Sequence, residues 1–422
     1  MNRLIFVIFL ICPTLLFAEE PGVRIVELEI EGLERTKLHV VERELLVEEG
    51  ERTTIEEIEE SVQRLRNMPI FDTVEYELED VADDAARLRI GAAERWTILP
   101  ILQFSFGGDV TRAELGVYDL NVLGRFFELG GEYRYVAGAH SFGLWYREPR
   151  FLGERILLEV EGWRGREVFI RYDLEQDVEG GFMLERDFGM FLLEPELSPR
   201  IRTMMGARFG RTSFSLGGVP EDARDAQDPA ALPDLSWVGS IMAGGRLGRI
   251  DEIGYRQTGQ EISANLELVR SLGGAEVGHV EPSLRLLFFR ALPWKSNVGV
   301  RLEWKATTAA NFAYHHYVGG LDEIRGYRNS RFNGRTFWNA NAEFRIPSLD
   351  HRLLVIQHVA LVDGLGIADD FAGLATVTGA SAGIGVRLIV PPVYGLILRF
   401  DLAYPVGAPG DAYFNAGSLQ FF

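Results

Sequence analysis

Few side chains in this sequence have the type and spacing needed for covalent or metal chemistry. Ser381 lies in Gly379-Ala-Ser-Ala-Gly383, which matches the Gly-x-Ser-x-Gly pattern of serine nucleophiles. That pattern needs a strand, a sharp turn and a helix, whereas Ser381 begins an alternating segment with no helical pattern after it. The adjacent His315 and His316 lack carboxylates at the spacing of a metal site. We therefore expect no enzyme activity, no metal and no cofactor.

A long polar loop offers a different chemistry, the recognition of a charged group. The loop of residues 307–334 is longer than a hairpin turn requires. It contains the segment Gly319-Gly-Leu-Asp-Glu-Ile-Arg-Gly-Tyr327. A guanidinium presents five donors in a fixed geometry, so Arg325 can bind a carboxylate through two parallel hydrogen bonds. Gly326 allows backbone conformations that other residues avoid. We expect a loop anchored by Arg325; a solvated Arg325 is the alternative.

The N-terminus has the three parts of a secretory signal peptide. Residues 1–3 carry a charge, residues 4–17 are apolar apart from a short break at 12–14, and the small residue Ala18 precedes two glutamates. This arrangement predicts cleavage after Ala18. Lipidation of Cys12 is disfavoured because Ile11 before it is not small. Cys12 is the only cysteine, so a mature chain lacking residues 1–18 has no disulfide.

The formal net charge of −19 argues against a nucleic-acid partner, because clustered Lys and Arg bind the phosphate backbone.

Residues 22–94 predict a compact α+β domain with the order β-α-α-β-β. Residues 23–31, 73–78 and 86–90 read as strands. Two helices are expected between the first two of these strands. The apolar face of the first helix consists of Leu38, Val41 and Leu45. The second helix begins at a capping box of Thr54 and Glu57, and its apolar face consists of Ile55, Ile58, Val62 and Leu65.

From residue 96 to residue 422 the helical period is replaced by period two. Near residue 300, the apolar set Val298, Val300, Leu302 and Trp304 alternates with Asn297, Gly299, Arg301, Glu303 and Lys305. A strand places such sets on opposite faces. A soluble β-sandwich alternates in the same way. The signal peptide, the long strands and the strand-like end of the chain favour a membrane barrel with an apolar belt outside and a polar lining inside.

The alternating segments number sixteen, an even number as expected of a bacterial barrel. They begin near residues 97, 111, 124, 139, 154, 179, 199, 235, 258, 281, 295, 335, 353, 381, 393 and 413. Short links such as 121–124 alternate with long ones such as 217–234, and we expect the short links to be periplasmic and the long ones extracellular. Residues 162–179 are interpreted as one extended hairpin; two further strands are the alternative.

These features resemble the BamA/TamA superfamily of outer-membrane assembly and translocation proteins, also called the surface antigen family. The α+β domain is similar to a single POTRA domain. The sixth extracellular loop of the superfamily has a Gly-Gly followed by a hydrophobic-Arg-Gly-aromatic tetrad, and five strands follow it. The matching residues here are Gly319 and Gly320, then Ile324, Arg325, Gly326 and Tyr327, together with similar segments at 119–124 and 383–387.

The resemblance implies that this loop folds back into the barrel lumen. Asp363 matches an Asp-x-Gly of the superfamily, and Glu343 shares its face with Asn339, Asn341 and Arg345. We expect Asp363 to be the partner of Arg325, with Glu343 as the alternative. If the lumen is partly filled with water, the pair contributes about 0 to 1 kcal/mol to stability.

The first and last strands, about residues 97–106 and 413–422, should form the seam that closes the barrel. In the superfamily this seam is weakly paired and opens sideways, so that a client strand adds to an exposed edge. Phe414, Gly417 and Phe422 mark the last strand, with Phe414 and Phe422 suited to a lipid face and Gln420 an imperfection between them. The same residues also fit a signal for the chain's own assembly.

Three classes of function fit such a chain: an assembly factor for other barrels, a two-partner-type secretion pore and a diffusion porin. A porin needs neither a POTRA domain nor the Arg-Gly loop, and secretion pores usually carry two POTRA domains. We therefore expect an outer-membrane barrel, residues 96–422, with a periplasmic POTRA domain, that helps to insert other proteins. Its partners would be unfolded polypeptide clients, the lipid bilayer and, as further candidates, accessory periplasmic proteins.

Overall fold

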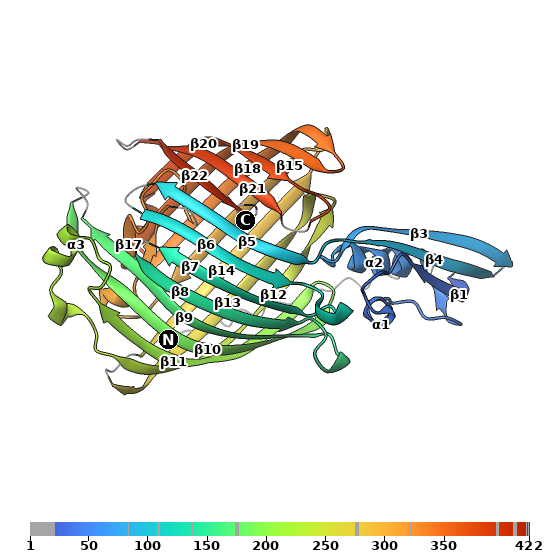
Figure 1. Ribbon diagram of the computed structural model, residues 1–422, viewed down its shortest axis with the longest axis horizontal. Coiled ribbons are helices and arrows are strands. Elements are labelled where there is room, and N and C mark those ends of the chain that lie inside the picture. The colour runs from blue at the N-terminus through green and yellow to red at the C-terminus, as the bar shows by residue number, and fades with distance from the viewer. Residues whose placement is uncertain are drawn as a thin grey trace, which may run out of the picture.

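The computed structural model describes residues 22–422 except 83, 108–109, 137, 174–176, 275–277, 321–322, 394–395, 408–411, 419 and 421. The expected signal peptide, residues 1–18, lies outside the described residues. A small α+β domain stands at one end of a large barrel, and its β3–β4 hairpin points away from the barrel (Figure 1).

The N-terminal domain is a four-stranded sheet that packs with two helices. Its strands β1 (Val23–Glu31), β2 (Arg52–Thr53), β3 (Phe71–Ala82) and β4 (Ala85–Glu94) have the order β2-β1-β4-β3, and its helices are α1 (Leu38–Glu42) and α2 (Ile55–Arg66). The predicted β-α-α-β-β order is confirmed, with the short β2 as an addition. Among the described residues, no helix combines the length and the hydrophobicity needed to cross a bilayer.

Helix α2 begins at the predicted capping box. Thr54 Oγ1 accepts a hydrogen bond from the Glu57 N–H at 3.2 Å, and Glu57 Oε2 accepts one from the Thr54 N–H at 2.8 Å. The bond from the Thr54 backbone lowers the pKa of Glu57. Ile58 is fully buried against the sheet, whereas Ile55 is 43% exposed because it lies in the first turn, at the rim of the core.

The barrel is a single sheet of sixteen strands in which every neighbouring pair is antiparallel. This confirms the predicted strand number. The strands are β5 (Ile98–Gly107), β6 (Val110–Asp119), β7 (Glu128–Val136), β8 (Ala139–Glu148), β9 (Ile156–Tyr172), β10 (Val178–Ser198), β11 (Ile201–Ser215), β12 (Ser236–Ile253), β13 (Arg256–Gly274), β14 (Gly278–Ala291), β15 (Asn297–Ala306), β18 (Thr336–His351), β19 (Leu354–Ala368), β20 (Gly379–Ile389), β21 (Ile397–Pro405) and β22 (Tyr413–Ser418).

The two faces of the wall have the burial expected of a membrane barrel. On β15, Leu302 is 45% exposed on the outside, while its neighbour Arg301 is 7% exposed on the lumenal side. A soluble sandwich would bury the leucine and expose the arginine. The outward apolar side chains therefore form the belt that contacts lipid.

Short and long links lie at opposite ends of the barrel. Residues 162–179 form one hairpin, as predicted, because β9 and β10 pair from Val178↔Tyr172 onward. The long links hold the remaining elements, which are α3 (Glu221–Ala226), β16 (His316–Val318), β17 (Phe332–Gly334) and the 3₁₀ turns Pro229–Ala231, Phe312–Tyr314 and Gly373–Ala375. Two short links contain the 3₁₀ turns Val122–Gly124 and Phe151–Gly153.

The α+β domain is docked on the short links. Glu44, which follows α1, accepts a hydrogen bond from Arg150 Nε at 2.6 Å, and both residues are buried. Asn67 donates to Asp251 at 3.0 Å, and the Lys37 N–H donates to the Gly124 carbonyl at 2.8 Å. These contacts reach two short links and the end of strand β12, so they fix the orientation of the domain on the barrel.

The continuous ladder from β5 to β22 gives a test of the barrel itself. In mild detergent the strand hydrogen bonds should survive, because hydrocarbon offers them no competing partner. We expect unboiled and boiled samples of the chain to migrate differently on a gel. Identical migration, together with solubility in the absence of detergent, would contradict a membrane barrel.

Candidate functional site

The long loop between β15 and β18 folds back into the barrel. Its β16–β17 hairpin pairs His316 with Gly334 and Val318 with Phe332. Between these strands, Ile324 is fully buried in a cluster with Val318, Phe337 and Leu365. Burial of Ile324 against side chains of β18 and β19 holds the loop on the lumenal face of the wall.

Arg325 is joined to Asp363 by three hydrogen bonds. Its Nε donates to Asp363 Oδ2 and its Nη2 donates to Asp363 Oδ1, both at 2.8 Å. Its backbone N–H also donates to Asp363 Oδ2, at 3.0 Å. This is the bidentate geometry that suits a guanidinium and a carboxylate. Asp363 lies on β19, so the contact joins the loop to the wall.

Glu343 of β18 is a second partner of the same guanidinium. Arg325 Nη1 donates to Glu343 Oε1 at 2.5 Å and lies 3.4 Å from Asp401 Oδ2 on β21. Both carboxylates considered from the sequence therefore contact Arg325, and they are not alternatives. Asp401 is a third carboxylate beside Arg325, and no motif in the sequence marks it as a partner.

The acidic residues are connected in turn to further arginines of the wall. Arg387 of β20 donates to Asp401 Oδ1 at 2.6 Å and to Glu343 Oε1 at 3.0 Å. Arg345 donates to Glu343 Oε2 at 2.8 Å. Four neighbouring strands, β18 to β21, thus contribute to one cluster around Arg325, which we call the lumenal charge cluster: Arg325, Glu343, Arg345, Asp363, Arg387 and Asp401.

Burial of this cluster corrects the expected energetics. Arg325 and Asp363 are each 1% exposed, and Glu343 is 2% exposed. The expectation of a water-weakened pair worth about 0 to 1 kcal/mol was wrong, because the loop fills this part of the lumen and excludes water from the pair. Breaking a buried pair costs about 3 to 5 kcal/mol, since the remaining charge is left without its partner.

The residues next to Arg325 fit the loop tightly against the wall. Gly326 has a φ of 87°, and a Cβ placed there would lie 3.2 Å from Ser381 of β20. The Tyr327 hydroxyl donates to the Ala380 carbonyl at 2.8 Å and accepts from the Ala380 N–H at 3.1 Å. At Gly319 a Cβ would lie 2.3 Å from the Arg328 carbonyl, so both glycines are needed for close approach.

The two ends of the sixteen-stranded sheet, β5 and β22, lie side by side (Figure 1). Between the described residues of these strands, no ladder register is formed, in contrast to the fifteen other pairs. Phe414 is 49% exposed on the outside, and Gly417 is buried, where a Cβ would lie 3.6 Å from Gln103 of β5. In the part of β5 and β22 that the structure describes, the seam is therefore a contact of edges without regular pairing.

The chain beyond β22 departs from the prediction. Phe422 was expected on the lipid face of the last strand, but β22 ends at Ser418. The Phe422 ring lies in the lumen, 5.6 Å from the guanidinium of Arg301, 5.5 Å from that of Arg345 and 6.0 Å from the Phe289 ring. Gln420 also turns inward and accepts from Arg387 at 3.3 Å. The inward turn gives these side chains cationic partners that the lipid face lacks.

Replacing Phe422 by alanine should weaken the barrel modestly. Two cation–π contacts are lost, at about 0.5 to 1 kcal/mol each, so we expect a loss of about 1 to 2 kcal/mol. Urea titration in detergent, followed by the fraction of unboiled barrel on a gel, measures it. Phe422→Tyr keeps the ring and should behave as the unchanged chain; an equal loss in both variants would contradict the lumenal position.

The residues considered for other chemistry have ordinary surroundings. Ser381 lies within β20 and is 1% exposed, without the helix that a nucleophile turn requires. In the part of the chain that the structure describes, no group of three His, Cys, Asp or Glu side chains could hold a metal ion. Neither His315 nor His316 therefore belongs to such a group.

Comparison with known proteins gives two family matches and several structural ones. The POTRA model, described as surface antigen variable number repeat, matches residues 23–90, and the Omp85 superfamily domain matches residues 279–421. No curated protein matches the sequence.

Three solved structures are similar to nearly the whole chain, at identities that indicate a shared fold. A crystal structure of BamA from Haemophilus ducreyi lacking POTRA domains 1–3 has 17% identity and a TM-score of 0.55, over 94% of this chain and 85% of that one. CdiB from Escherichia coli has 12% identity and a TM-score of 0.63, over 95% and 77%. CdiB from Acinetobacter baumannii has 11% identity and a TM-score of 0.56, over 94% and 73%.

Proposed function

Since the chain belongs to the Omp85 superfamily and carries a single POTRA domain, we propose that it inserts other barrel proteins into the outer membrane. Membership supports a role in insertion into that membrane or in translocation across it, and insertion is the more specific proposal. The barrel lies in the membrane, and the POTRA domain, which is docked on the short links, lies in the periplasm. The role is non-enzymatic.

The seam is the observation that carries this proposal. Among the described residues, β5 and β22 are adjacent but do not form a ladder, so opening the seam breaks no regular set of hydrogen bonds. An opened seam presents two strand edges with unpaired N–H and C=O groups. A client strand that is unpaired in the membrane gains its missing hydrogen bonds by adding to such an edge.

The POTRA domain supports the first step of the same process. Among the described residues, strand β3 is at the edge of its sheet and has β4 as its one neighbouring strand. Its free edge lies on the part of the domain that points away from the barrel (Figure 1). An extended client segment can add to this edge before it reaches the seam.

The second candidate is a two-partner-type secretion pore, which would move a polypeptide through the lumen. A polar lumenal cavity of about 350 Å³ beside the long loop favours it. The lumenal charge cluster disfavours it, because the buried loop would have to leave the lumen before a chain could pass. The single POTRA domain is also fewer than such pores usually carry.

Depletion of the protein in its own bacterium, followed by proteomics of the outer membrane, tests the two roles. An insertion factor predicts that several unrelated barrel proteins disappear from the membrane. Loss of one secreted protein, with all barrels retained, would replace the proposal by the secretion pore. Loss of neither would refute both.

A further inference from the structure

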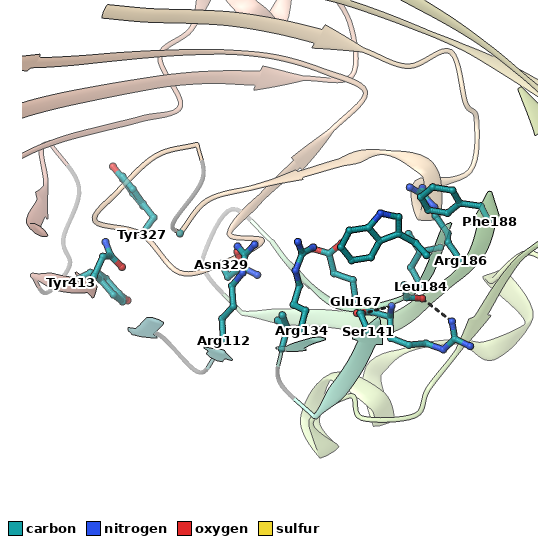
Figure 2. A pocket seen from close by; sticks show the side chains of 16 residues that line it. Arg112, Arg134, Ser141, Glu167, Leu184, Arg186, Phe188, Tyr327, Asn329 and Tyr413 are labelled. Atoms are coloured by element: carbon teal, nitrogen blue, oxygen red, sulfur yellow. Dashed lines mark hydrogen bonds between the residues drawn. The ribbon is translucent and has the colours of Figure 1, made fainter. Parts of the chain in front are cut away.

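A cavity of about 350 Å³ lies in the lumen, separate from the lumenal charge cluster. Its lining comes from three parts of the chain: the wall strands β6 to β10, the long loop and the seam strand β22. In Figure 2 the seam residue Tyr413 and the loop residue Tyr327 lie at one end, and Arg186 and Phe188 lie at the other. The volume is within the range of about 300 to 1,000 Å³ found for ligand sites.

The charge of this cavity is opposite to that of the chain. The sequence has a net charge of −19, yet the cavity is lined by the side chains of Arg112, Arg134 and Arg186 and by one acidic residue, Glu167. A fourth arginine, Arg166, contributes its backbone, because its side chain points to the other face of β9. A cationic cavity in an acidic protein points to an anionic ligand.

Three of the four arginines already have carboxylate partners. Arg112 and Arg134 lie 2.6 and 2.7 Å from Glu114, and Arg166 lies 2.9 Å from Glu185. Arg186 has no ion pair or hydrogen bond with any described residue, and it is exposed to the cavity. The charge of Arg186 acts on Glu281 of β14 without a direct contact between the two side chains, so the guanidinium donors of Arg186 remain available to a ligand.

The rest of the lining suits a peptide. Trp163 and Phe188 bring aromatic rings to the cavity beside the arginines. On the seam strand, Asn415 is only 5% exposed, and its side-chain Nδ2 has no acceptor among the described residues. A buried amide donor without a partner is costly unless a ligand or water accepts from it.

We propose that this cavity binds an acidic side chain of a polypeptide, with its carboxylate held by Arg186. Trp163 and Phe188 contact the apolar groups beside that carboxylate, and Asn415 donates to a peptide carbonyl. Strands β6 to β10 are joined by continuous ladders, which separate the cavity from lipid on that side and leave it open to a chain in the aqueous lumen. The inference rests on the proposed function, in that the ligand is a polypeptide client.

The test is binding of a labelled acetyl-Phe-Glu-Phe amide to the full chain in detergent, followed by fluorescence anisotropy. The glutamine peptide, which has the same shape without the charge, should bind about tenfold more weakly, as expected for one charge-assisted hydrogen bond. Arg186→Gln should abolish this difference, and Arg186→Lys should retain part of it. Arg164→Gln is the matched control, because Arg164 follows Trp163 on β9 and therefore lies on the opposite face.

Several outcomes would overturn the site. Equal affinity for the two peptides would show that no carboxylate is recognised, and equal losses in Arg186→Gln and Arg164→Gln would show that only overall charge matters. Competition by inorganic phosphate at the concentration of the peptide would show an unspecific anion site. Each of these results leaves the depletion experiment unaffected, so failure of the cavity is distinguishable from failure of the proposed function.

Discussion

Arg325→Ala is expected to destabilise the barrel by about 3 to 5 kcal/mol, because it removes one partner of a buried ion pair. Asp363 then loses both guanidinium hydrogen bonds and remains buried at 1% exposure. Glu343 is less affected, since Arg345 and Arg387 still donate to it. The measurement is the urea midpoint of the folded barrel in detergent, read from the mobility of unboiled samples.

A second substitution separates the lost contact from the stranded charge. In the double variant Arg325→Ala/Asp363→Asn the buried carboxylate is neutral, so we expect part of the stability to return. Arg328→Ala is the control, because Arg328 belongs to the same loop but is exposed. Its effect should stay within about 0.5 kcal/mol.

The functional readout of the same variants is complementation of a depleted strain. Variants that fold but do not complement would show that the loop's position matters beyond stability. If Arg325→Ala were as stable as the unchanged chain, the pair would not be an important part of the lumenal charge cluster. If the defects of Arg325→Ala and Asp363→Asn were additive, the two residues would act independently.

Alternation of side chains was enough to predict the wall of the barrel. On β15 it assigns Arg301 to the lumen and Leu302 to lipid, and both are correct because a strand has a period of two. The same rule places Asp401 and Arg399 on the lumenal face of β21. It does not indicate which loop they meet, since that depends on the curvature and register of four strands.

Two features of the site depended on tertiary structure that no local pattern encodes. The burial of Arg325 follows from the volume of a loop packed inside the lumen, so the sequence suggested a wetter pair than the structure has. Phe422 was assigned to lipid because alternation was continued past the last ladder residue. Once the chain leaves the ladder at Ser418, the alternation of side chains no longer determines which face a residue occupies. The Phe422 ring instead contacts lumenal arginines.

Deletion of residues 22–94 is expected to leave the barrel folded and to abolish its activity. The POTRA sheet shares no ladder with the sixteen wall strands in the described part of the chain. Its contacts with the barrel are at the short links and at the strand ends beside them, including Leu99 of β5 in the core of the domain. Removing Glu44 leaves Arg150 facing water, where an unpaired charge is tolerated. The unboiled form should therefore persist on gels.

Loss of activity should follow because the first contact with clients is removed. The free edge of β3 disappears with the domain, whereas the seam between β5 and β22 remains. The test compares truncated and full-length chains at equal amounts of folded barrel for complementation of a depleted strain. Full complementation by the truncated chain would mean that the seam alone receives clients. A truncated chain that fails to fold would instead show that the joint at Glu44 and Arg150 supports the barrel, and the predicted independence of the two domains would be wrong.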